Sequence, residues 1–123
     1  MKVMVVDDER DVEFLFRQRF RKELREGSIE FFFAFSGEEA LNYLGGLSAP
    51  DVVLVLSDIN MPGMTGLELL KSVKEKFSQL RVCMITAYND ETNYNTAMQF
   101  GAEEYLTKPL DFDRLKKDVL ALA

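Results

Sequence analysis

The segment KVMVVDDERD (residues 2–11) decides the fold, because it joins an apolar run directly to a group of charged residues. Residues 3–6 are all apolar and mostly β-branched, which is typical of an interior strand of a parallel sheet whose faces are both covered. Asp7 and Asp8 follow this strand immediately. Carboxylates at the end of a buried strand cost free energy unless they are paired, so their presence needs an explanation.

Strand-like runs alternate with segments of helical periodicity along the rest of the chain. The predicted strands are Lys2–Val6, Ile29–Phe35, Val52–Ser57, Arg81–Thr86 and Glu104–Thr107. Apolar residues three and four apart, the spacing of one helix face, follow the first, second, third and fifth runs. These stripes are Val12, Leu15, Phe16, Phe20 and Leu24; Ala40, Leu41, Leu44 and Leu47; Leu67, Leu70, Val73 and Phe77; and Phe112, Leu115, Val119 and Leu122.

Helix start signals agree with these stripes. Ser36 and Thr65 each stand three residues before a glutamate, as in a capping box, and Asp111 precedes the last stripe. Residues 89–96 are the exception: Asn, Thr and Asp have low helix propensity, so we expect this fourth helix to start late or fray. The alternation predicts one α/β domain over residues 1–123, a doubly wound (βα)5 three-layer sandwich with a parallel sheet.

The composition argues against several functions. Lysine and arginine number 15 against 21 acidic residues, and the net charge of −6 argues against direct binding of nucleic acid or anionic lipid. The chain has no histidine, the commonest zinc ligand. Its one cysteine, Cys83, lies in a strand-like run, so we expect no intrachain disulfide and a reducing, cytoplasmic compartment. No apolar stretch reaches the roughly 20 residues of a membrane span.

Polar side chains stand at the ends of four predicted strands. Asp7 and Asp8 end the first, Asp58 the third, Thr86 the fourth and Lys108 the fifth. Each alone fits ordinary turn, cap or strand-end chemistry. Ligands of open parallel sheets bind at the carboxyl ends of the strands, so the coincidence of all four favours one shared site.

The chemistry of these residue types indicates a metal ion and a phosphoryl group. Three carboxylates within about 5 Å would repel by roughly 3 kcal/mol per pair, so the group needs a cation. Oxygen donors without histidine favour Mg²⁺ or Mn²⁺ over zinc. A lysine and a threonine hydroxyl suit the oxygens of a phosphoryl group, which need positive charge and hydrogen-bond donors.

Over essentially its whole length, the chain resembles the receiver domain of bacterial two-component response regulators, including the chemotaxis regulators. The resemblance rests on four segments in the order and spacing of that family: VMVVDDE (residues 3–9), LVLSDINMPGMTGLELL (residues 54–70), MITAY (residues 84–88) and FGAEEYLTKPLD (residues 100–111). It implies a flavodoxin-like fold with strand order 2-1-3-4-5. It also implies a signalling domain rather than an enzyme that turns over a substrate.

The resemblance assigns roles to the residues at the strand ends. Asp58 would accept the phosphoryl group from a phosphohistidine of a sensor kinase or phosphotransfer protein. Asp8 would bind Mg²⁺ directly and Asp7 through water, with Asp58 and the backbone carbonyl of Asn60 as further ligands; Mn²⁺ can substitute. Lys108 would pair with the phosphoryl oxygens.

The resemblance also implies which residues change conformation on phosphorylation and which control how the phosphoryl group and water reach the site. The peptide bond to Pro109 is cis in this family. Thr86 would move toward the phosphoryl group and Tyr105 would turn inward behind it. Ala87 leaves room for the phosphoryl group, whereas Tyr88 is bulky and lies where water would approach. We therefore expect slow to moderate autodephosphorylation.

The expected output surface is the face formed by the loop after Arg81–Thr86, the fourth helix, the strand Glu104–Thr107 and the last helix. It would control an output domain or an effector protein. The fourth helix carries no lysine or arginine, which does not support the charge-paired homodimer of some regulators, although a homodimer remains open. The sequence leaves open the kinase, and whether the chain is a complete regulator or part of a larger protein.

Three other functions share some of these features, and each lacks support at particular residues. A phosphatase of the haloacid dehalogenase type also uses an aspartyl nucleophile and Mg²⁺, but it has a second aspartate where this chain has Asn60. A flavodoxin-like binding module needs a phosphate loop after the first strand, and the acidic residues 7–9 would repel a phosphate there. A receiver-like scaffold that is never phosphorylated usually lacks the acceptor or the acidic pair, and both are present here.

Overall fold

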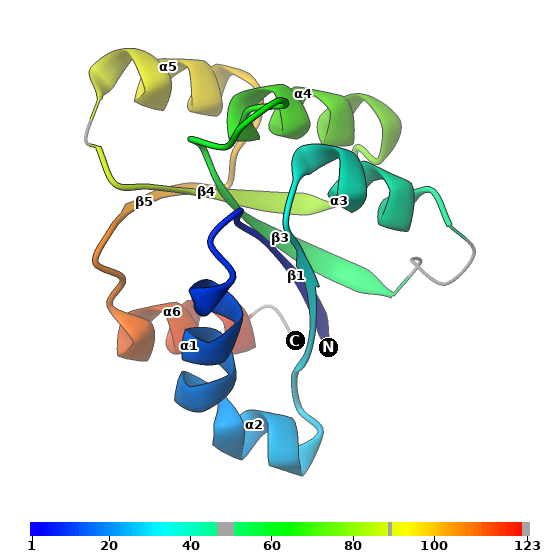
Figure 1. The fold of residues 1–123 in the computed structure, drawn as a ribbon, viewed down its shortest axis with the longest axis vertical. Helices are drawn as coiled ribbons and strands as arrows, with labels where there is room; N and C mark the ends of the chain where they lie inside the picture. The colour runs from blue at the N-terminus through cyan, green and yellow to red at the C-terminus, as the bar shows by residue number, and fades with distance from the viewer. Residues whose placement is uncertain (47–50, 89, 122–123) are drawn as a thin grey trace.

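The computed structural model describes residues 1–46, 51–88 and 90–121. A five-stranded sheet crosses the centre of the molecule in the order β2-β1-β3-β4-β5, and every pairing is parallel (Figure 1). The strands are β1 (Lys2–Val6), β2 (Glu30–Ala34), β3 (Val52–Asp58), β4 (Arg81–Thr86) and β5 (Glu104–Thr107). This confirms the predicted strand order and a parallel sheet. β2 is one residue shorter at each end than expected, and β3 includes Asp58.

Helices cover both faces of the sheet. They are α1 (Asp11–Arg19), α2 (Arg21–Glu26), α3 (Gly37–Leu44), α4 (Gly66–Lys76), α5 (Glu91–Gln99) and α6 (Phe112–Leu120). Figure 1 shows α3, α4 and α5 on one side of the sheet and α1 and α6 on the other. The three-layer, doubly wound architecture is therefore confirmed.

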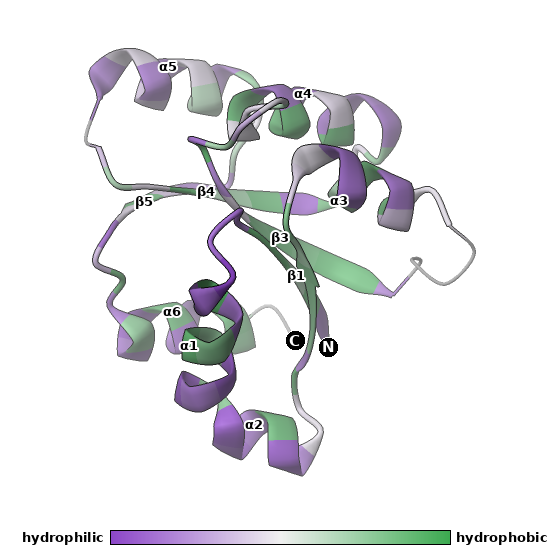
Figure 2. Cartoon of the chain, viewed as in Figure 1, coloured by the Kyte–Doolittle hydropathy of each residue, from purple (hydrophilic) through white to green (hydrophobic). Residues whose placement is uncertain are grey.

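Alternate residues of the strands feed two separate cores. In β1, Met4 lies in the core beneath α3, α4 and α5, whereas Val3 and Val5 lie in the core beneath α1 and α6. Because side chains of a strand alternate between faces, a strand covered on both sides must be apolar throughout. Figure 2 shows this change along the chain: the central strands are green, and the loop after β1 is purple.

The core beneath α1 and α6 is built from aromatic rings. Phe16 stacks on Phe20 with ring centroids 6.0 Å apart, and it meets Phe112 edge to face at 5.2 Å. Phe31 meets Phe20 edge to face at 5.1 Å. Such pairs add to the free energy gained by burial, and they fix α1 and α6 side by side on the sheet.

The periodicity of the first apolar stripe predicts one helix, but the chain forms two helices there. The chain turns at Phe20, whose backbone angles are φ −106° and ψ 18°, so α1 ends at Arg19 and the short α2 begins at Arg21. Phe20 is fully buried. The aromatic packing of this side chain accompanies the turn, which periodicity alone does not reveal.

The expectation that the fourth helix starts late is wrong, whereas fraying of this helix stays a prediction. Its helix, α5, begins at Glu91, and the Asp90 side chain accepts hydrogen bonds from the backbone N–H groups of Thr92 and Asn93 at 2.8 and 3.3 Å. Residues that are poor inside helices are good at their N-termini, where they satisfy free N–H groups. Leu47, Asn89 and Leu122 lie outside the described residues.

All three predicted residues cap their helices, but within the described residues only Thr65 forms the full capping box that was predicted for Ser36 as well. Thr65 and Glu68 form a reciprocal capping box at the start of α4. Ser36 accepts a hydrogen bond from the Glu39 N–H, and Asp111 accepts one from the Arg114 N–H. Each cap fixes where a helix leaves the carboxyl edge of the sheet. Among the helices of the described ranges, none is long and apolar enough to span a bilayer.

Candidate functional site

Three carboxylates from two neighbouring strands meet at the carboxyl edge of the sheet. One oxygen from each of Asp7, Asp8 and Asp58 lies within 4.8 Å of the others. Asp7 and Asp58 are buried, and Asp8 is exposed. Val6 pairs with Ser57 across β1 and β3, so the residues that follow them emerge side by side.

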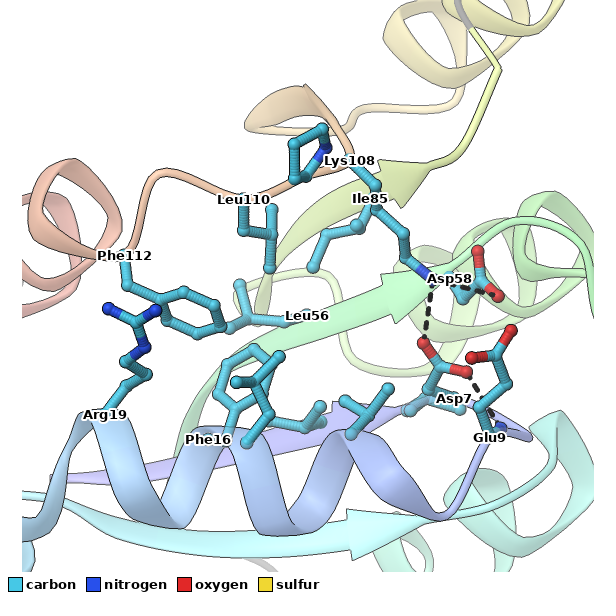
Figure 3. Close-up of a pocket in the computed structure, with 15 residues that line it drawn as sticks. Asp7, Glu9, Phe16, Arg19, Leu56, Asp58, Ile85, Lys108, Leu110 and Phe112 are labelled. Carbon is cyan, nitrogen blue, oxygen red and sulfur yellow. Dashed lines mark hydrogen bonds and ion pairs between the residues drawn. The ribbon is translucent and has the colours of Figure 1, made fainter.

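Lys108 supplies the positive charge of the site. Its Nζ lies 3.2 Å from Asp7 Oδ2, to which it donates a hydrogen bond, and 3.8 Å from Asp58 Oδ2 (Figure 3). Burial lowers the pKa of Lys108, but the charges of Asp7 and Asp58 outweigh it and raise the pKa above its usual value. The lysine therefore stays protonated and bridges the two carboxylates.

Asp58 has the most strongly perturbed carboxyl group of the site. Burial and the neighbouring charge of Asp7 raise its pKa to about 6, although Lys108 and the N–H groups of Asn60 and Ile59 act in the opposite direction. One lysine does not neutralise three carboxylates. The site therefore suits a hard divalent cation, whose charge would stabilise the ionised form of Asp58.

This raised pKa predicts a pH-dependent stability difference. A carboxyl whose pKa is higher in the folded state than its ordinary 3.8 binds its proton more tightly there, so lowering the pH through 6 stabilises the fold. Without divalent cations, Asp58→Asn should be more stable than wild type at about pH 8, and this advantage should shrink by about 1 kcal/mol by about pH 5. Urea unfolding of both proteins measures it. A difference that does not change with pH would contradict the raised pKa.

Gly66 is a site residue that the sequence analysis did not single out. It is the first residue of α4, and its N–H donates to the Ile59 carbonyl at 2.8 Å. A Cβ at this position would lie 2.7 Å from Ile59 Cα and would also meet the Asp58 carbonyl. Only glycine lets α4 approach the strand end that carries Asp58. The capping pattern that begins at Thr65 predicts the start of this helix, but it does not reveal how closely the helix approaches β3.

Thr86 and Tyr105 lie beside each other behind the site. Thr86 is fully buried, and its hydroxyl accepts a hydrogen bond from the Tyr88 N–H at 3.1 Å. The Tyr105 hydroxyl donates to the Tyr88 carbonyl at 3.5 Å. Burial and the Asp90 charge raise the pKa of Tyr105, and the Thr86 hydroxyl acts in the opposite direction. These contacts connect β4 to β5 through the chain at Tyr88.

The remaining predicted residues lie around this centre. Asn60 is exposed just after β3, and Ala87 and Tyr88 are exposed just after β4. The peptide bond between Lys108 and Pro109 is cis. The structure thus places the predicted strand-end residues along one edge of the sheet.

Comparison with known proteins decides the family. A model of the response regulator receiver domain matches residues 3–120. The chain belongs to this family. As a receiver domain, it is a component of two-component signalling.

Relatives of this receiver domain include both short and long proteins. Sporulation initiation phosphotransferase F of Bacillus subtilis is 32% identical over 124 residues, covering 96% of this chain and 90% of that protein. The DNA-binding transcriptional regulator NtrC of Klebsiella pneumoniae is 47% identical over 78 residues, covering 63% of this chain and 16% of that protein. The solved response regulator TrrA of Thermotoga maritima, in complex with Mg²⁺ and BeF, is 33% identical with a TM-score of 0.78, covering 99% of this chain and 98% of that one.

Proposed function

We propose that this receiver domain accepts a phosphoryl group on Asp58 from a phosphohistidine of a sensor kinase or phosphotransfer protein. One observation carries the proposal: a buried carboxylate with a lysine ammonium 3.8 Å away and two further carboxylates beside it. This arrangement places a nucleophile, a cation for phosphoryl oxygens and a metal-binding group at one point. The domain is a phosphoacceptor that catalyses only its own phosphorylation and dephosphorylation.

In the proposed reaction, a carboxylate oxygen of Asp58 attacks phosphorus in line with the leaving imidazole nitrogen. The new bond is an acyl phosphate, and the bond between nitrogen and phosphorus breaks. Lys108 moves from its carboxylate partners toward the phosphoryl oxygens and neutralises their charge. A bound Mg²⁺ would lower the repulsion between the carboxylate and the incoming phosphoryl group.

The contacts of the acidic pair predict different roles in metal binding. Both oxygens of Asp7 are engaged, Oδ1 by the Glu9 N–H at 2.9 Å and Oδ2 by Lys108, whereas Asp8 is exposed. We therefore expect Asp8→Ala to weaken Mn²⁺ binding by about 100-fold and Asp7→Ala by about 10-fold. Titration of free Mn²⁺ by electron paramagnetic resonance measures both. Equal losses would contradict the assignment, as would tight zinc binding by the wild type.

The proposed switch begins at Thr86. An acyl phosphate adds oxygens that the Thr86 hydroxyl can donate to, and this favours a conformation in which Thr86 moves toward the site. Its present partner, the Tyr88 N–H, is then released, and the space behind Thr86 can admit the ring of Tyr105. Tyr105 also meets Tyr94 of α5 edge to face at 5.3 Å. The change would thereby reach the face formed by α5, β5 and α6.

Amide hydrogen exchange tests this switch. With Mg²⁺ and beryllofluoride, a phosphoryl mimic, the amide exchange rates of residues 87–88 and 90–106 should change several-fold. Thr86→Ala should lose most of this change. Thr107→Ala is the matched control, because Thr107 is the partner of Thr86 across β4 and β5 but is exposed. Equal responses in all three proteins would exclude Thr86 as the coupling residue.

The partners follow from this function. Since NtrC is a DNA-binding transcriptional regulator, an output domain on the same chain is one target of the face formed by α5, β5 and α6, and a separate effector is the other. The net charge of −6 does not suit DNA binding by the domain itself, so we place DNA contacts outside it. Tyr88 is 68% exposed beside the site, where it would restrict water and prolong the phosphorylated state. We place the protein in the cytoplasm.

A further inference from the structure

A cavity of about 320 Å³ extends from the acidic site along α1 (Figure 3). Its walls are apolar over most of their length and come from the sheet, α1 and the segment after β5. These walls are formed by Val5, Val6, Val12, Leu15, Phe16, Leu56, Ile85, Pro109, Leu110 and Phe112. The volume is about twice that of an apolar cavity of roughly 150 Å³ that is large enough to bind benzene. It falls within the range of small-molecule sites.

The two ends of this cavity carry opposite charge. At one end, Asp7, Glu9 and Asp58 surround Lys108. At the other end is Arg19, whose guanidinium lies 5.4 Å from the ring centroid of Phe112 (Figure 3). Apolar side chains such as Leu56 and Leu110 separate these ends.

The Arg19 end opens onto a group of cationic side chains, which we call the basic cluster: Arg19, Arg21, Lys22 and Lys116. This cluster lines a second hollow of about 470 Å³ that shares Leu15 and Arg19 with the apolar cavity. Lys116 is paired with Glu23 at 3.3 Å. Within the described residues, the other three cations take part in no ion pair shorter than 4.0 Å.

The basic cluster is unusual for this chain, whose net charge is −6. Cations in the last turn of α1 also interact favourably with the helix dipole, so charge alone does not indicate a ligand. The decisive feature is that Arg19 lines both hollows, so the apolar cavity meets a second hollow whose cations Arg21 and Lys22 also have no carboxylate partner within 4.0 Å among the described residues. A ligand that satisfies both surfaces must combine a negative head with an apolar body.

We propose that the space between α1 and α6 binds a small amphiphilic anion, such as a medium-chain carboxylate. Its tail occupies the apolar cavity and its head lies among the cations of the basic cluster. Without a bound metal ion the reverse orientation is disfavoured, because an anionic head would meet Asp7, Glu9 and Asp58 at the other end. The head-group residues lie outside the acidic centre, whereas the cavity that holds the tail ends at Asp58 and Lys108.

Octanoate is the probe for this proposal, titrated into the unphosphorylated protein without divalent cations, so that the acidic end offers no metal ion to the carboxylate. Methyl resonances of Val12, Leu15, Leu56 and Leu110 should shift together and saturate, below the concentration at which octanoate forms micelles. Octanol and octylammonium supply the same tail with a neutral and a positive head. Each should bind at least about fivefold more weakly than octanoate, the factor expected from one partly exposed ion pair.

Two variants test the head group. Arg19→Gln combined with Lys22→Gln should weaken octanoate binding by about tenfold and leave octanol binding unchanged. Arg17→Gln is the matched control, because it removes a cation from α1 that borders neither hollow, and it should change binding less than twofold. A third variant, Leu15→Trp, should block the cavity mouth and reduce binding of both octanoate and octanol.

Three results would overturn the proposal. The first is the absence of saturable shifts at the cavity methyls. The second is equal or tighter binding of octylammonium, which would place the head at the acidic end. The third is an equal loss of octanoate affinity in the Arg17→Gln control and in the double variant at Arg19 and Lys22. That result would show nonspecific attraction of the anion to positively charged helices.

Discussion

Asp58→Asn should abolish the phosphoryl adduct that wild type forms with a small donor such as acetyl phosphate and Mg²⁺. The asparagine amide keeps the size and most contacts of the aspartate, but its oxygen carries no negative charge and is a poor nucleophile. We expect the rate of adduct formation to fall at least about 1,000-fold, as for the loss of other catalytic nucleophiles. Intact-protein mass spectrometry measures the gain of one phosphoryl group over time.

Asp113→Asn is the matched control for this substitution. Asp113 is exposed in the first turn of α6, so its replacement should leave the rate within about twofold of wild type. Urea unfolding establishes that both variants are folded. An Asp58→Asn protein that gains the adduct at the wild-type rate would show that the acceptor lies elsewhere.

Gly66→Ala should have the largest effect on stability of any glycine-to-alanine substitution in the chain, because the Cβ added there would meet rigid backbone most closely. Alanine normally stabilises a helix relative to glycine by up to about 1 kcal/mol, so helix propensity predicts a gain. Here the added Cβ would lie 2.7 Å from Ile59 Cα, where neither backbone can move without shifting the end of β3. We expect a net loss of about 3 kcal/mol in the free energy of unfolding.

Gly45→Ala provides the comparison. Gly45 follows α3 with helical backbone angles, and an added Cβ would lie 3.4 Å from its closest neighbour, the Leu41 carbonyl. We expect a change within about 1 kcal/mol for this variant. Urea unfolding of the two variants and wild type measures both effects. A Gly66→Ala protein as stable as wild type would show that α4 is not held against the strand end that carries Asp58.

The fold was predictable because a doubly covered parallel sheet leaves a direct trace in the sequence. Residues 3–6 are apolar on both faces, and only a strand covered by helices on both sides tolerates that. The strand ends were equally informative, because parallel strands bring Asp7 and Asp58 together on the neighbours β1 and β3, and Lys108 follows β5 on the same edge of the sheet. The meeting of these side chains therefore followed from topology and not from any local motif.

Other features depend on contacts between distant segments, which periodicity does not encode. The turn at Phe20 accompanies packing against Phe16 and Phe31, and the need for glycine at position 66 depends on how closely α4 approaches β3. The cavity that ends at Arg19 arises only when α1 and α6 are placed side by side. The start of α5 differs from the prediction for another reason: aspartate is a poor residue inside a helix, but Asp90 stands before the helix and caps it.

The most direct test of the phosphoacceptor role is to locate the phosphoryl group chemically in the wild-type protein. Borohydride reduces an aspartyl phosphate to homoserine, and proteolysis with peptide mass spectrometry then identifies the converted residue. After treatment with acetyl phosphate and Mg²⁺, we predict homoserine at position 58 and none when Mg²⁺ is chelated. Homoserine at position 7 or 8, or conversion at position 58 that does not require a divalent cation, would contradict the account.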